Sequence, residues 1–186
     1  MSLFVGLPDK KYEVVYLDPP WSYDSGPGFM GAAANHYQTA SDADLLAFPL
    51  KPLLADRAVV FMWATCPRLD FAIDCLRAWG LHYRGVASVW VKTNKDGSPM
   101  GAAGVRPTLV KPTTELLLAA TTNRKGRVFP LLTEAMRQVV LAPRGRHSEK
   151  PAEFRDRLVE LLGDRPRIEL FARTTAPGWD CWGNEV

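Results

Sequence analysis

Hydrophobic positions gather along the chain into short segments separated by turn signals. Six segments of strand length are rich in apolar residues, at 13–17, 57–63, 82–92, 115–120, 138–141 and 167–171. Short apolar runs with β-branched and aromatic residues are typical of buried strands. Helical patterns lie between several of them, and this alternation predicts an α/β domain with a mainly parallel sheet flanked by helices on both faces.

Helix start and stop signals frame three of the intervening stretches. Ser41 followed by Asp44 is close to a capping box, so a short helix begins there. Pro67 stands where a first helical residue would, ahead of a second helix. Pro151 opens a third helix, whose apolar residues share one face up to Gly163. In contrast, 93–112 contains three glycines and three prolines and is interpreted as a long functional loop.

Length and composition set the broad class. With 186 residues and 47% hydrophobic content, the chain is expected to form one compact domain over 1–186. It has no run of eighteen apolar residues and no basic, apolar leader at its start, so we expect a cytoplasmic protein. Its three cysteines lie apart from one another without metal-site spacing, which predicts reduced thiols and no metal.

The net charge of +3 is unevenly distributed. The segment 84–150 holds twelve Lys/Arg against four Asp/Glu, a net charge of +8, and the remainder carries −5. Much of the positive charge lies in expected loops, including the turn 123–127 with Arg124, Lys125 and Arg127. These three are candidate phosphate contacts for a polyanion, with an ordinary solvated surface as the alternative.

The clearest candidate chemistry follows the first expected strand, at Asp18-Pro19-Pro20-Trp21. Asp-Pro-Pro alone could be a simple turn, but an aromatic residue beside a carboxylate in a loop suggests a planar ligand. An ionised Asp18 and the Pro19 carbonyl are both acceptors, and Trp21 offers a stacking surface. Together they could hold the two N–H groups of an exocyclic amine and direct its lone pair to an activated methyl group.

These four residues resemble the catalytic motif of the MT-A70 family of adenine N6 methyltransferases. Further segments resemble the family in order and spacing, from about Tyr12 to the end of the chain: His36-Tyr37-Gln38-Thr39, Val60-Phe61-Met62-Trp63, Trp90-Val91-Lys92-Thr93-Asn94, His147-Ser148-Glu149-Lys150-Pro151, Glu169-Leu170-Phe171-Ala172-Arg173 and Gly178-Trp179-Asp180-Cys181-Trp182-Gly183-Asn184-Glu185.

The resemblance implies a Rossmann-like, S-adenosylmethionine-dependent methyltransferase fold. It implies that Asp18 and Pro19 hold the adenine amino group while Trp21 stacks on the base, with Pro20 completing the motif. It also implies these further contacts: Tyr37 to the adenine, and Asp18, His147, Ser148, Lys150, Arg173, Asn184 and Glu185 to the cofactor. The segment before the 151 helix is also a physical candidate for an anion such as the methionine carboxylate, although a plain helix cap is the alternative.

Three functions agree with these features. The first is N6 methylation of adenine in DNA, which we favour because the compact form resembles bacterial and phage members of the family. The second is the same reaction on RNA, and the third is a non-catalytic nucleic-acid-binding subunit that supports an active partner. We expect a monomer or weak homo-oligomer, with a partner subunit as the alternative, and no membrane association.

Overall fold

The computed structural model describes residues 4–23, 40–101, 109–145 and 149–186. Seven strands form one sheet in the order β5-β3-β4-β2-β1-β6-β7. Their bounds are β1 Tyr12–Leu17, β2 Leu54–Thr65, β3 His82–Thr93, β4 Thr114–Thr121, β5 Val139–Pro143, β6 Arg167–Leu170 and β7 Asp180–Trp182.

The sheet is mainly parallel. The pairs β1–β2, β1–β6, β3–β5 and β6–β7 are parallel, and β4 runs antiparallel to its neighbours β2 and β3. The direction of β4 matters for function, because its start lies at the carboxyl edge of the other strands and its end at their amino edge. The predicted α/β class and the Rossmann-like architecture are confirmed.

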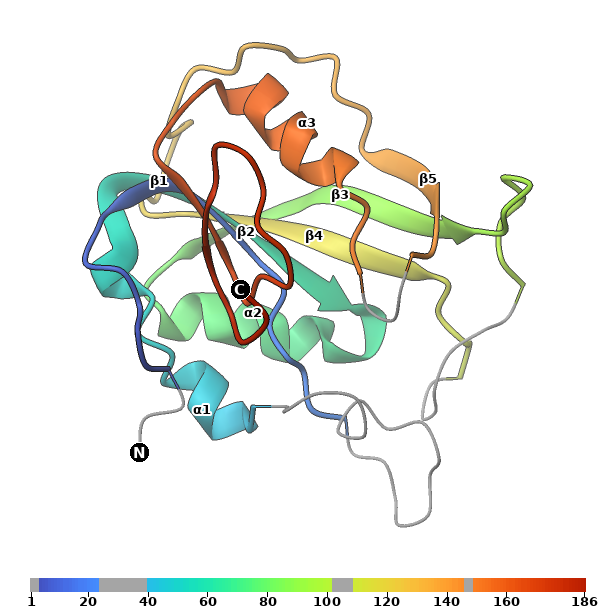
Figure 1. The fold of residues 1–186 in the computed structure, drawn as a ribbon, viewed down its shortest axis with the longest axis horizontal. Helices are drawn as coiled ribbons and strands as arrows, with labels where there is room; N and C mark the ends of the chain where they lie inside the picture. The colour runs from blue at the N-terminus through green and yellow to red at the C-terminus, as the bar shows by residue number, and fades with distance from the viewer. Residues whose placement is uncertain (1–3, 24–39, 102–108, 146–148) are drawn as a thin grey trace.

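Helices cover both faces of the sheet, as Figure 1 shows. α1 (Asp42–Leu46), η2 (Lys51–Leu53), η3 (Cys66–Arg68) and α2 (Leu69–Ala78) lie on one side, and α3 (Glu153–Leu162) lies on the other. Alternate residues of each strand enter one of two cores. Val15 and Leu17 pack with the α1 and α2 side, whereas Val14 and Tyr16 pack with the α3 side. This two-sided burial explains why the strands read as continuous apolar runs.

Local signals set several boundaries. The Ser41 side chain accepts a hydrogen bond from the Asp44 backbone N–H, and the Asp44 side chain accepts from the Ser41 backbone, so the predicted capping box is confirmed. Pro67 lies in the short η3 turn that leads into α2, and Gly163 caps α3. In the described part of the chain, no helix is long and apolar enough to cross a membrane.

The sequence predicted six strands, with none after 167–171, and this is wrong because β7 follows that segment. Only three residues form β7, paired in parallel with β6. A strand this short has almost no periodicity, and it lies among prolines and glycines that favour loops. Its pairing therefore depends on a neighbouring strand rather than on a local pattern.

Candidate active site

Asp18 lies directly after the carboxyl end of β1, near the middle of the sheet. Leu17, the last residue of β1, pairs with Met62 of β2 on one side and with Leu170 of β6 on the other. The chain segments that follow β1 and β6 therefore leave the sheet side by side. Ligands of open α/β sheets bind at this carboxyl edge.

The two prolines that follow Asp18 make the backbone of this turn rigid. The Pro19 carbonyl accepts a hydrogen bond from the Trp21 N–H at 2.8 Å, and the Pro20 carbonyl accepts one from the Ala40 N–H at 3.1 Å. Proline fixes φ and has no N–H to donate, so this turn has few alternative conformations. A carbonyl oxygen has two lone pairs, and Pro19 therefore retains one for a ligand.

A cavity of about 100 Å³ opens beside this turn. Eight of the sequence-predicted residues line it, namely Asp18, Pro19, Pro20, Trp21, Lys150, Arg173, Asn184 and Glu185. Five further residues complete the lining, namely Tyr23, Thr65, Glu115, Phe171 and Ala172. The structure thus brings the motif after β1 and the segment after β6 to one crevice at the carboxyl edge of these two parallel strands.

Four charged side chains form a chain of ion pairs at the cavity. The Lys150 ammonium lies 2.5 Å from an Asp18 carboxylate oxygen and 3.1 Å from a Glu115 carboxylate oxygen. The other Glu115 oxygen lies 2.6 Å from the Lys92 ammonium. Sequence reasoning expected Lys150 to face an anion of the cofactor, but the structure pairs it with two carboxylates of the protein. Its main contacts therefore orient Asp18 and Glu115.

Burial and pairing shift the pKa values of this network in different directions. Burial raises the pKa of Asp18, and the attraction of Lys150 offsets that effect only in part. Burial would also raise the pKa of Glu115, but Lys150 and Lys92 bring it below its usual value. Burial lowers the pKa of Lys150, yet the two carboxylates outweigh it and raise that pKa above its usual value. Lys150 is therefore a permanent cation at physiological pH.

Glu115 and Lys92 were not among the predicted site residues. The sequence features that could have indicated them are a lone acidic residue at the start of the otherwise apolar run 115–120 and a lysine at the end of the expected strand 82–92. Glu115 pairs in register with Trp90 of β3, which brings it close to Lys92. Strand pairing is a long-range property, so the sequence gives no direct measure of this proximity.

Trp21 lines the cavity but is not an exposed plate. Its residue is 3% exposed, and its ring makes an edge-to-face contact with Phe71 at a centroid distance of 6.1 Å. The Arg68 guanidinium covers Phe71 at 4.3 Å. The Phe71 ring of α2 thus shields one part of Trp21, while the residue still lines the cavity. The indole N–H is buried without a hydrogen-bond partner in the described residues.

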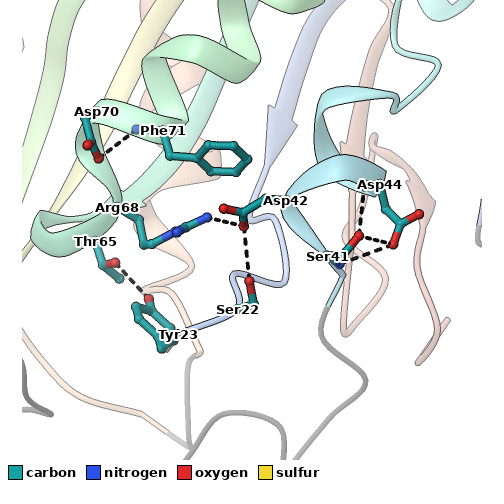
Figure 2. A network of polar contacts seen from close by, with 9 residues as sticks. All are labelled: Ser22, Tyr23, Ser41, Asp42, Asp44, Thr65, Arg68, Asp70 and Phe71. Carbon is teal, nitrogen blue, oxygen red and sulfur yellow. Dashed lines mark hydrogen bonds and ion pairs between the residues drawn. The ribbon is translucent and has the colours of Figure 1, made fainter. Parts of the chain in front are cut away.

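A polar network anchors the segment that follows the motif, as Figure 2 shows. Ser22 donates to an Asp42 carboxylate oxygen at 3.2 Å, and Arg68 forms an ion pair with the same oxygen. The Tyr23 hydroxyl lies 2.8 Å from the Thr65 hydroxyl. Side chains from α1, from the end of β2 and from η3 therefore hold this segment.

The segment after β6 turns sharply to bring polar residues to the cavity. Phe171 has φ 60° and is the one non-glycine residue with a left-handed backbone in the described ranges, an unfavourable conformation for a bulky side chain. The Ala172 N–H then donates to the Trp182 carbonyl at 3.0 Å. A Cβ at Gly183 would lie 2.1 Å from the Ala172 carbonyl oxygen, so only glycine permits this approach.

Arg173 and Glu185 face each other as a result of this packing. The Arg173 Nε lies 3.7 Å from a Glu185 carboxylate oxygen, and their side chains are 32% and 57% exposed. Both residues line the cavity. Tyr37, His147 and Ser148, which the sequence also predicted, lie outside the described residues.

The predicted phosphate contacts at Arg124, Lys125 and Arg127 are not near this cavity. They follow the end of β4, whose last residue, Thr121, pairs with Val59 near the start of the parallel strands. Figure 1 shows this turn on the left, away from the right-hand ends of β3 and β5. The structure therefore does not bring these three residues together with Asp18.

Comparison with known proteins gives a family for this chain. The MT-A70 family model matches residues 12–185. The chain is 33% identical to Type II methyltransferase M.MunI of Mycoplasma sp, over 100% of this chain and 82% of the relative. It is 33% identical to N6-methyladenosine RNA methyltransferase MTA1 of Pyricularia oryzae and 28% identical to N(6)-adenine-specific methyltransferase METTL4 of Mus musculus. It spans 47% and 38% of the lengths of these two relatives.

Proposed function

Because this chain belongs to the MT-A70 family, we propose that it transfers a methyl group from S-adenosylmethionine to N6 of adenine in DNA. The observation that carries the proposal is the Asp18 carboxylate, held by Lys150 inside a cavity that Arg173, Asn184 and Glu185 also line. A relative whose length this chain nearly spans is named a type II methyltransferase, and the named RNA methyltransferase is more than twice as long. This difference favours DNA.

The cavity residues fit S-adenosylmethionine. The cofactor has an ammonium, a carboxylate and ribose hydroxyls, and the cavity offers carboxylates, a guanidinium and an amide. The loosely paired Arg173 and Glu185, with Asn184, would hold the ribose. At about 100 Å³ the described cavity is smaller than a typical ligand pocket of roughly 300–1,000 Å³, so it would enclose only part of the cofactor.

When bound, the cofactor supplies a methyl group on a positively charged sulfur. The residues of the chain bind and orient the amine that receives it. Asp18 accepts one amine N–H, and the free lone pair of the Pro19 carbonyl accepts the other. Lys150 keeps Asp18 in a fixed direction and favours its ionised, acceptor form. This fixed geometry contributes through orientation and electrostatics, without requiring a strong base.

The target adenine must leave the base stack to reach this site. Asp18 and Pro19 line a cavity, and an adenine inside a duplex cannot present its amine there. Flipping the base costs about a few kcal/mol, and less for an unpaired strand. We therefore expect single-stranded or mismatched DNA to be methylated at least as readily as a perfect duplex.

The test is incubation of the full chain with labelled S-adenosylmethionine and matched single-stranded and duplex DNA and RNA, followed by nucleoside mass analysis. We expect N6-methyl-2′-deoxyadenosine from DNA. Methylation of RNA alone would contradict DNA as the proposed substrate. Methylation of none of these nucleic acids would contradict the proposed activity. Calorimetry with the cofactor identifies the remaining alternative, since a purely structural subunit would give no binding heat.

A further inference from the structure

Three loops with exposed cations leave the same corner of the sheet. β3 ends at Thr93, which pairs with Pro143 at the end of β5. The Lys92 N–H donates to the Thr113 carbonyl at 2.9 Å, just before β4 begins. The chain therefore passes this corner three times, and Lys95, Lys111 and Arg144 stand within two residues of these pairings. We call these three residues the basic corner.

The side chains of the basic corner are available for a ligand. Lys95, Lys111 and Arg144 are all exposed, and none forms an ion pair within the described ranges. Two carboxylates lie close by. Asp96 accepts hydrogen bonds from the backbone and hydroxyl of Ser98 at 2.9 and 2.6 Å. Glu149 lies beside Gly145.

The basic corner adjoins the candidate active site through β4. Glu115, the second residue of β4, lines the cavity and contacts both Lys92 and Lys150. These inner lysines are already paired with carboxylates, so they contribute little net charge to a substrate. The cations just outside them form no ion pair with any residue that the structure describes. A polynucleotide with one base in the cavity would pass over this edge of the sheet.

The other basic group of the chain lies at the opposite edge. β4 has eight residues and runs from the carboxyl edge to the amino edge. At roughly 3.4 Å per residue, about 25 Å separates the basic corner from the turn that holds Arg124, Lys125 and Arg127. Arg127 is moreover paired with Glu134 at 2.7 Å. A short strand that reaches Asp18 would not extend to this turn.

We propose that Lys95, Lys111 and Arg144 bind the phosphates that flank the target base, whereas Arg124, Lys125 and Arg127 do not contact the substrate. This inference rests on the proposed function, because it takes a nucleic acid as the substrate. It divides the cations of the basic segment 84–150 into a group that binds the substrate and a group that is only solvated surface. Phosphate contacts of this kind set affinity and its dependence on salt.

The test compares two triple variants with the same change in charge. One is Lys95→Gln/Lys111→Gln/Arg144→Gln, and the other is Arg124→Gln/Lys125→Gln/Arg127→Gln. Binding of a fluorescent single-stranded DNA is measured at several salt concentrations, together with kcat/KM and thermal stability. We expect the variant of the basic corner to bind about tenfold or more weakly. The slope of log K against log salt should become less steep by about two. The turn variant should stay within about twofold of the unaltered protein.

Equal losses in both variants, or a larger loss in the turn variant, would overturn the inference. So would unchanged binding in the corner variant. The binding assay does not need turnover, so it remains decisive even if the protein methylates no nucleic acid. Failure of the proposed function appears separately, as absence of N6-methylated product from the unaltered protein.

Discussion

The ammonium of Lys150 lies 2.5 Å from a carboxylate oxygen of Asp18, across a separation of 132 residues. This contact ties the turn after β1 to the segment that leads into α3, so two walls of the cavity are joined by one ion pair. Glu115 shares the ammonium at 3.1 Å. The charge of Asp18 is thus balanced inside the protein, and its orientation is fixed before any substrate arrives.

Asp18→Asn is expected to reduce kcat by about 10²- to 10³-fold, because an amide N–H₂ replaces an acceptor with a donor facing the substrate amine. Steady-state methylation of a DNA oligonucleotide measures this, with cofactor affinity followed by calorimetry. Asp74→Asn is the matched control, since Asp74 is 60% exposed in an ion pair with Arg77 and is not among the residues that line the cavity. Near-normal turnover in Asp18→Asn would remove the role assigned to this carboxylate.

The pH at which kcat/KM falls on the acid side should depend on the charge of Glu115. Asp18 must be ionised to accept an amine N–H, and its pKa is raised, so kcat/KM should fall with decreasing pH at a higher pH than for an ordinary aspartate. The Glu115 charge raises the pKa of Asp18 and competes for Lys150. Glu115→Gln is therefore expected to lower that pKa and move the acid limb to lower pH.

Glu134→Gln provides the control for this shift, because Glu134 is 70% exposed and pairs with Arg127. Its rate profile should match that of the unaltered protein. A Glu115→Gln profile with an unmoved acid limb, or one displaced to higher pH, would show that Asp18 does not control the titration.

Much of this site could be predicted from local sequence. The apolar run 13–17 ends at Asp-Pro-Pro, which identified both the strand and the loop after it. The capping box at Ser41 likewise depends on residues three apart. In each case the physical cause lies within one turn or one strand of the chain, so a pattern is sufficient.

The parts that could not be predicted depend on strand order and direction. Nothing in the segment 115–120 shows that β4 runs antiparallel, yet that direction places Glu115 at the cavity and Arg124 at the opposite edge. The burial of Trp21 similarly requires Phe71 from a different element. β7 becomes a strand only through its pairing with β6.

Arg68 is expected to affect turnover through the position of the catalytic segment. It pairs with Asp42, which also accepts from Ser22, and its guanidinium covers the ring that shields Trp21. Arg68→Met should lower kcat by about tenfold while cofactor affinity stays close to normal, because small displacements of a reacting geometry are costly. Single-turnover and steady-state kinetics measure the effect.

Arg77→Met is the control, because it tests whether loss of a different ion pair, one within α2, also lowers kcat. Arg77 pairs with Asp74 through side chains that are 69% and 60% exposed, and such pairs contribute about 0–1 kcal/mol. Its kcat should be unchanged. If Arg68→Met also keeps normal kcat, or if Arg68→Lys fails to recover part of the loss, the network in Figure 2 has no positioning role.

Gly163 should be the more sensitive of two glycines to substitution by alanine. It ends α3 at φ 82° and ψ −177°, a region almost restricted to glycine, and its N–H donates to the Val159 carbonyl at 2.7 Å. A Cβ there would also lie 3.1 Å from Leu132. Gly163→Ala is therefore expected to lower the free energy of unfolding by about 1–3 kcal/mol, measured by urea denaturation.

Gly101→Ala is the control, since a Cβ at Gly101 meets nothing within 4 Å, and it should change stability by less than about 0.5 kcal/mol. Equal stability of the two variants would contradict the strained cap.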